Sequence, residues 1–103
     1  MRIQSCPTDV VSAPAERVWE LFIRPDRLAQ WTKCALEEGP RRSVTTGERF
    51  SFRKGPFHIR YEVVGVDAPR ELALDIRLPF GVLNREVVRI TPLGPERCRV
   101  TLN

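Results

Sequence analysis

The chain has 103 residues, of which 42% are hydrophobic and 29% charged, and its formal net charge at pH 7 is +4. This composition excludes a disordered chain and predicts one folded domain over residues 1–103. No apolar run approaches the ~20 residues that span a bilayer, and the N-terminus lacks the apolar region of a signal peptide. We therefore expect a cytoplasmic protein without membrane insertion.

The first third of the chain predicts a strand followed by two short helices. Residues 2–11 are expected to form the strand. Pro14 suits the first helical position, with Ala13 as a weak N-cap, and apolar residues at helical spacing follow. Pro25 ends this helix and opens a second one with a shorter apolar stripe that includes Leu28.

After Trp31 the pattern is typical of strands and turns. Strands are expected over residues 33–38, 48–53, 57–63, 72–78, 82–91 and 97–102, separated by turns rich in glycine and proline. Apolar residues mostly alternate with arginine, glutamate and aspartate, so one face of the sheet is buried and the other meets water. The sequence predicts an α+β fold, with a curved antiparallel sheet of six to seven strands and two short helices after the first strand.

The helical segment also carries a distinctive order of residues. Ala-Pro stands at 13–14, Val-Trp at 18–19 and Pro-Asp at 25–26, and Leu28 and Trp31 follow. This order resembles the opening of the START-like, helix-grip (SRPBCC) superfamily, which includes polyketide cyclase/dehydrase-like proteins and lipid carriers. The resemblance covers nearly the whole chain in element order, and it implies a ligand cavity between the sheet and the helices.

The chain departs from this family at its C-terminal end. In the proteins that it resembles, a long C-terminal helix covers the apolar face of the sheet, whereas this chain ends at Asn103, where that helix would start. Two explanations stay open: the sequence is a truncated piece of a longer protein, or a second copy covers the face. Because a large exposed apolar patch marks an interface, we expect self-association as a homodimer.

The strand over residues 82–91 holds the candidate chemistry. If Val88 and Ile90 point inward, strict alternation carries Asn84 and Glu86 inward as well. An inward Glu86 would have a raised pKa and act as a general acid or base, with Tyr61 or Asn84 as its partner. The alternative is a bulge near residues 85–87 that turns Glu86 out to solvent.

The apolar cavity supports three functions. The first is binding of a small hydrophobic or aromatic molecule, lipid- or polyketide-like, without chemistry. The second is a cyclase or dehydratase that uses the inward carboxylate, and the third is a protein–protein interaction module. The residues expected to line the cavity, or alternatively to fill the core, are Trp19, Phe22, Trp31, Phe50, Phe52, Phe57, Ile59, Tyr61, Leu74, Ile76, Asn84, Glu86 and Val88.

Other kinds of site find little support. His58 is the sole histidine and alternates with apolar residues, so it should face solvent. The three cysteines, Cys6, Cys34 and Cys98, have no close pair and no metal-ligand spacing, so we expect reduced thiols, no metal and no cofactor. The arginines are spread along the chain among acidic residues, which argues against a nucleic-acid partner.

Overall fold

The computed structural model describes residues 8–102. Its elements in chain order are β1 (Thr8–Val11), α1 (Ala15–Ile23), α2 (Pro25–Thr32), β2 (Ala35–Glu38), β3 (Arg49–Lys54), β4 (Phe57–Asp67), β5 (Glu71–Arg77), the single 3-10 turn η1 (Pro79–Gly81), β6 (Leu83–Gly94) and β7 (Arg97–Leu102). Of the expected first strand, only the part from Thr8 is described, and Cys6 lies outside the described residues.

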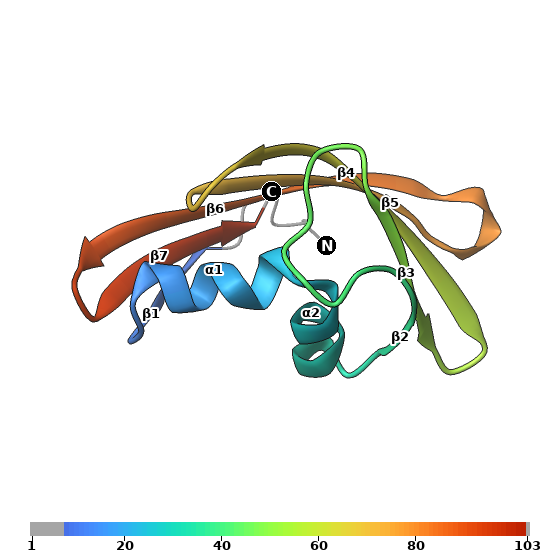
Figure 1. Cartoon of the computed structure of the whole chain (residues 1–103), viewed down its shortest axis with the longest axis horizontal. Coiled ribbons are helices and arrows are strands. Elements are labelled where there is room, and N and C mark those ends of the chain that lie inside the picture. The colour runs from blue at the N-terminus through green and yellow to red at the C-terminus, as the bar shows by residue number, and fades with distance from the viewer. Residues whose placement is uncertain (1–7, 103) are drawn as a thin grey trace, which may run out of the picture.

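The seven strands form one antiparallel sheet in the order β1-β7-β6-β5-β4-β3-β2. Consecutive strands from β2 to β7 are neighbours, and β1 joins the sheet beside β7. The sheet curves around α1 and α2, which both lie on its concave side (Figure 1). This arrangement confirms the α+β, helix-grip prediction.

The start of one helix and the start of one strand differ from their predicted places by one or two residues. Pro14 has extended backbone angles (φ −62°, ψ 146°) and is itself the N-cap, so α1 begins at Ala15 and Ala13 lies outside the cap. Lys33 takes a left-handed conformation (φ 62°) and ends α2, so β2 begins only at Ala35. Pro25 opens α2 as predicted, because its fixed φ suits the first turn of a helix.

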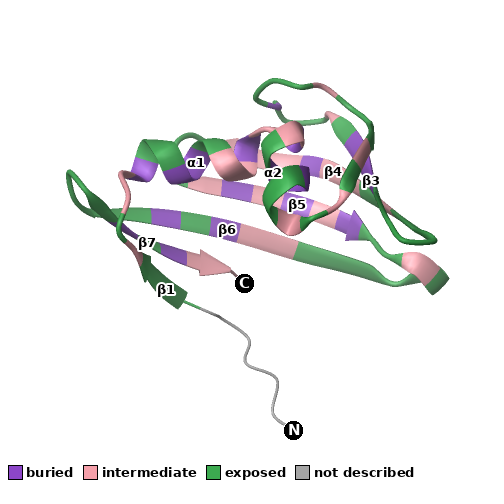
Figure 2. Cartoon of the chain, turned by 90° about the horizontal axis from the view of Figure 1, so that it is seen from below, coloured by how far each residue is buried: buried purple, intermediate pink, exposed green. Residues whose placement is uncertain are grey.

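The core lies between the concave face and the two helices (Figure 2). Each helix contributes one apolar stripe to the core, and strands β3 to β7 contribute their inward-facing side chains. The opposite face of β3–β6 carries arginine, glutamate and aspartate side chains, as the alternation predicts. The buried hydrophobic residues are Ala15, Val18, Trp19, Ile23, Leu28, Ala29, Val44, Phe50, Phe52, Val63, Leu72, Leu74, Ile76, Val88, Ile90, Cys98 and Val100.

The register of β6 settles how its residues face. Its pairing with β5 is unbroken from Glu71↔Arg89 to Arg77↔Leu83, so the alternative bulge near residues 85–87 is wrong. The irregularity of β6 lies instead at Pro92/Gly94, against β7, and the strand extends to Gly94, beyond the predicted end at residue 91. Glu86 therefore lies on the same face as Val88.

Candidate functional site

The concave face divides into a covered half and a more open half. Helix α1 packs on β6 and β7, whereas α2 packs on β2. Between them, toward the β3–β4 and β5–β6 turns, the concave face of β4–β6 carries polar groups among apolar ones. Tyr61 pairs with Ile76, which in turn pairs with Asn84, and the next inward row ends in Glu86.

Tyr61 is half-buried among aromatic rings. Its ring stacks on that of Phe50, with centroids 4.7 Å apart and planes 9° from parallel, and lies 4.9 Å from the ring of Phe52. Burial, with smaller electrostatic contributions from Cys34 and Glu86, raises the pKa of Tyr61 to about 12. The hydroxyl thus stays protonated at neutral pH and can donate a hydrogen bond.

Glu86 is half-buried on an apolar surface. Burial raises the pKa of its carboxyl above the ordinary value, and no other described residue forms a hydrogen bond or ion pair with it. Asn84 lies two residues earlier on the same face and is exposed. A carboxyl group in such a place can accept a hydrogen bond, or give and take a proton at a less acidic pH than a solvated glutamate.

Cys34 lies near these groups, although its place in the sequence predicts only a reduced thiol. It follows the left-handed Lys33 that ends α2, and its half-buried thiol lies 3.7 Å from the carbonyl oxygen of Thr32. Cys34 and Tyr61 both pack, partly buried, against the same hydrophobic core. Nothing in the local sequence signals this neighbourhood, because it depends on how α2 packs beside the sheet.

The other predicted lining residues occupy three environments. Phe22 and Ile59 are half-buried against the core, whereas Trp31 and Phe57 are exposed. The indole N–H of Trp31 donates to the carbonyl of Leu21 at 2.9 Å, and its ring meets that of Phe22 edge-on at 5.3 Å. The residues buried in the protein's own core are Trp19, Phe50, Phe52, Leu74, Ile76 and Val88.

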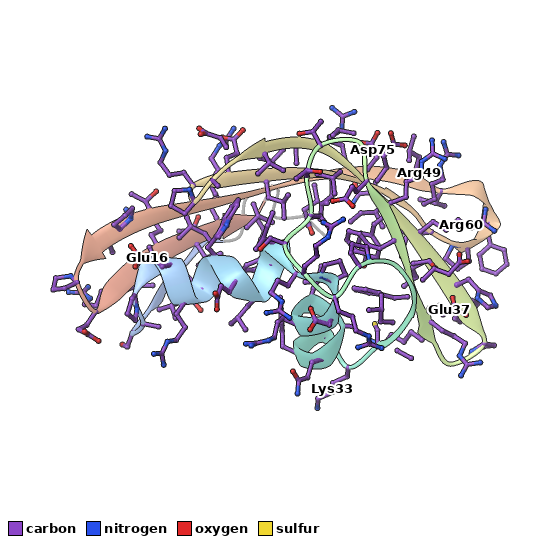
Figure 3. The ribbon with its side chains drawn as sticks, viewed as in Figure 1. Glu16, Lys33, Glu37, Arg49, Arg60 and Asp75 are labelled. Atoms are coloured by element: carbon purple, nitrogen blue, oxygen red, sulfur yellow. The ribbon has the colours of Figure 1, made fainter. Side chains whose placement is uncertain are left out.

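A separate depression of about 350 Å³ lies on the opposite, convex face. It is surrounded by Arg49, Ser51, Arg60, Glu62, Asp75 and Arg77, together with Glu38, Phe50 and Tyr61. Figure 3 shows Arg49, Arg60 and Asp75 pointing away from the helices. This charged surface does not suit a hydrophobic molecule, so the concave face is the better candidate for the predicted ligand.

The described residues offer little else for chemistry. Within residues 8–102, no three histidine, cysteine, aspartate or glutamate side chains gather as metal ligands would. Cys34 and Cys98 are free thiols, and burial raises the pKa of the Cys98 thiol. His58 is exposed, as predicted, and its Nδ1 lies 2.9 Å from a carboxylate oxygen of Glu37. None of the described helices is both long and apolar enough to cross a membrane.

Solved structures of similar fold include three from different organisms. An HSP90 activator from Plasmodium falciparum is 15% identical, with a TM-score of 0.76 over 94% of this chain and 68% of that one. CalU16 from Micromonospora echinospora is 18% identical, with a TM-score of 0.72 over 94% and 56%. The Aha1 dimer from Colwellia psychrerythraea is 11% identical, with a TM-score of 0.73 over 95% and 73%.

At these identities the likeness extends to the fold alone. No curated protein matches the chain. The family profile described as "Polyketide cyclase / dehydrase and lipid transport" matches residues 7–103, which is nearly the whole sequence. The seven-stranded sheet, the two helices and this match together show that the chain belongs to the polyketide cyclase/dehydrase and lipid transport family.

Proposed function

We propose that the chain binds a small apolar or aromatic molecule on its concave face, with Glu86 and Tyr61 holding the polar end of that molecule. The observation that carries the proposal is the half-buried carboxyl of Glu86, which has no partner among the described residues. Partial burial of an unpaired polar group disfavours the folded state, so such a group is usually kept for an external partner.

The surroundings of Glu86 support an apolar ligand. The adjacent inward position on β5 is Leu74, and Val88 follows on β6. Tyr61 adds a neutral hydroxyl that can donate where a carboxylate can only accept. A molecule with one polar end and an aromatic or aliphatic body fits this combination, and the family's description names both polyketides and lipids.

Native mass spectrometry of the purified chain tests the proposal. A non-covalent mass that stays with the folded chain and is lost on denaturation supports binding, and titration with the neutral probe phenylnaphthylamine gives an affinity. Glu86→Leu and Tyr61→Phe should change that affinity several-fold. Glu71→Gln is the matched control, because Glu71 lies at the far end of β5 and is bonded to Arg89. If neither a co-purified mass nor probe binding is observed, the proposal is wrong.

The raised pKa of Glu86 favours a second candidate function, which is proton transfer on a bound carbonyl compound. In this alternative the carboxylate removes a proton from carbon next to a carbonyl, as a cyclase or dehydratase reaction requires. Deuterium exchange into an aromatic β-diketone, followed by NMR in deuterated water, would reveal the step. Glu86→Gln should abolish exchange and leave binding in place. Equal exchange by this variant and the unaltered chain would exclude proton transfer by Glu86.

We further propose that a second copy of the chain covers part of the concave face. The half-buried Ile59, Tyr61 and Leu102 leave apolar surface there, and the similarly folded Aha1 of Colwellia psychrerythraea is a dimer. The same native mass spectra report the number of copies. A monomer at all concentrations would contradict this proposal and leave ligand binding unaffected.

The cytoplasmic location stays a prediction.

A further inference from the structure

Exposed apolar side chains gather at one end of the molecule. Eight large hydrophobic side chains are exposed among the described residues, and five of them belong to the β3–β4 and β5–β6 hairpin tips, at the right-hand end of Figure 1. These five are Phe57, Leu78, Phe80, Val82 and Leu83. We call this end, formed by residues 53–60 and 75–85, the hairpin end.

Phe80 is held outward rather than left loose. It is 92% exposed, and its backbone adopts a left-handed conformation (φ 68°, ψ 25°) that residues other than glycine rarely take. The N–H of Leu78 donates to the carbonyl of Val82 at 2.8 Å and closes the turn. The ring of Phe57 meets that of Phe80 edge-on, with centroids 6.2 Å apart. The turn thus presents an aromatic ring to the surroundings.

The charge of the chain gathers at the same end. The hairpin end holds five of the seventeen basic residues and one of the thirteen acidic ones, which gives +4, the formal net charge of the whole chain. The acidic residue, Asp75, is already paired with Arg85. The rest of the sequence is balanced, and one of its acidic residues, Glu37, lies against His58 of the hairpin end; the end is therefore basic, although by less than the segment count alone.

The four remaining basic residues form no ion pair with a carboxylate among the described residues, although Arg77 also acts electrostatically on Asp75: Arg53, Lys54, Arg60 and Arg77. Arg60 and Arg77 stand directly opposite each other on β4 and β5, and Glu38, Glu62 and Asp75 line the same depression. A negatively charged surface placed against this end would neutralise the positive charges of Arg53, Lys54 and Arg60.

We propose that the hairpin end docks on an anionic lipid surface. The ring of Phe80 enters the headgroup region, and the unpaired basic residues contact lipid phosphates. This is a surface contact rather than a membrane span, and it holds whether or not the concave face binds a ligand. A fluid surface accepts a protruding ring without a fitted pocket, whereas a protein partner would need a matching surface of roughly 800 Å². A second copy docked end to end would bring two basic surfaces together.

Sedimentation of the full chain with lipid vesicles tests the proposal. The chain should bind vesicles that mix phosphatidylglycerol with phosphatidylcholine, bind pure phosphatidylcholine vesicles much less, and be released by salt. Phe80→Ala should weaken binding by about tenfold or more, because one buried ring is lost. Arg60→Ala and Arg77→Ala should each weaken it by about fivefold.

Matched controls come from the opposite end of the sheet. Leu93→Ala removes an exposed apolar side chain at the β6–β7 turn, and Arg97→Ala removes a neighbouring exposed cation; both should bind like the unaltered chain. In a second measurement, brominated lipid should quench the fluorescence of Phe80→Trp more than that of the unaltered chain, which already contains Trp19 and Trp31, whereas Leu93→Trp should show no such increase.

Three results would overturn the proposal. They are no sedimentation with either vesicle, equal binding by Phe80→Ala and the unaltered chain, or a dimer in solution that Phe80→Ala dissociates while vesicles stay unbound. The last result would assign the hairpin end to a second copy. If the first result is accompanied by retention of the chain on an acidic protein, the partner of the hairpin end is a protein and not a lipid.

Discussion

The two halves of β6 have different surroundings although they belong to one continuous strand. In the half under α1, Val88 and Ile90 are 1% and 2% exposed. In the other half, Asn84 is exposed and Glu86 is half-buried at the same alternating positions. The first half is a core strand, and the second lines an open surface with polar groups on it.

This difference shows that a strand's inward face is not automatically its core. Alternation places Asn84, Glu86, Val88 and Ile90 on one side of the strand. A position on that side is shielded from solvent only where a helix covers it. Where α1 ends, polar residues can stand on the inward side without an internal partner. Substitutions on either side of this boundary should therefore behave differently.

The largest effect is expected in the covered half. Leu72 pairs with Val88 and is fully buried, so Leu72→Ala should lower the free energy of unfolding by about 2 to 5 kcal/mol. Asn84→Ala, in the open half, should change it by no more than about 0.5 kcal/mol. Urea unfolding followed by circular dichroism measures both. Equal losses would mean that the two halves do not differ.

A backbone position tests whether the open half is rigid. Gly39 has φ 134°, and a Cβ there would lie 2.4 Å from the Cβ of Phe50, which stacks on Tyr61. Gly39→Ala should cost about 2 kcal/mol or more from strain and clash together. Gly55→Ala is the control, since its φ of 60° gives strain but no atom lies within 4 Å; it should cost about 1 kcal/mol. Similar losses of stability in the two variants would show that the backbone around Phe50 can shift to accommodate the added methyl group.

Glu86 should oppose folding, in contrast to Val88. Glu86→Leu is expected to stabilise the chain at neutral pH by up to about 1 kcal/mol, because it removes a partly buried, unpaired carboxylate. The folded chain keeps the Glu86 proton to higher pH than the unfolded chain, so stability falls as pH rises from 4.5. Glu86→Gln should lack this component. If the free energy of unfolding of the unaltered chain and that of Glu86→Gln depend on pH in the same way, the carboxyl of Glu86 is not buried as described.

The smallest expected change in stability concerns Tyr61, the sole tyrosine of the chain. Tyr61→Phe keeps the ring stack and should change stability by about 0.5 kcal/mol or less. The pKa is the sharper measurement: the tyrosinate absorbance should rise near pH 12 and not near 10. Because the unfolded chain ionises first, folding weakens as pH rises from 10 toward 12. A Tyr61 pKa near 10 would mean that the side chain is fully exposed to solvent.

The sequence by itself determined the elements and their faces. Pro14 and Pro25 marked the helix starts to within one residue, because proline's fixed φ acts locally. Alternation identified the inward residues of β3 to β7 and the solvent-facing His58, because neighbouring side chains of a strand must point to opposite faces. The residues of the family resemblance lie in the segment that forms α1 and α2.

The tertiary structure decided what those faces meet. Only the packing of α1 separates Val88 from Glu86, and only the position of α2 brings Cys34 into the electrostatic surroundings of Tyr61. The unbroken pairing with β5 decided that Glu86 faces inward. The gathering of Phe80 with Arg60 and Arg77 required two hairpins distant in sequence to share one end. The physical reason is common to all: alternation is a property of neighbouring residues, whereas burial and charge depend on which distant segments pack against them.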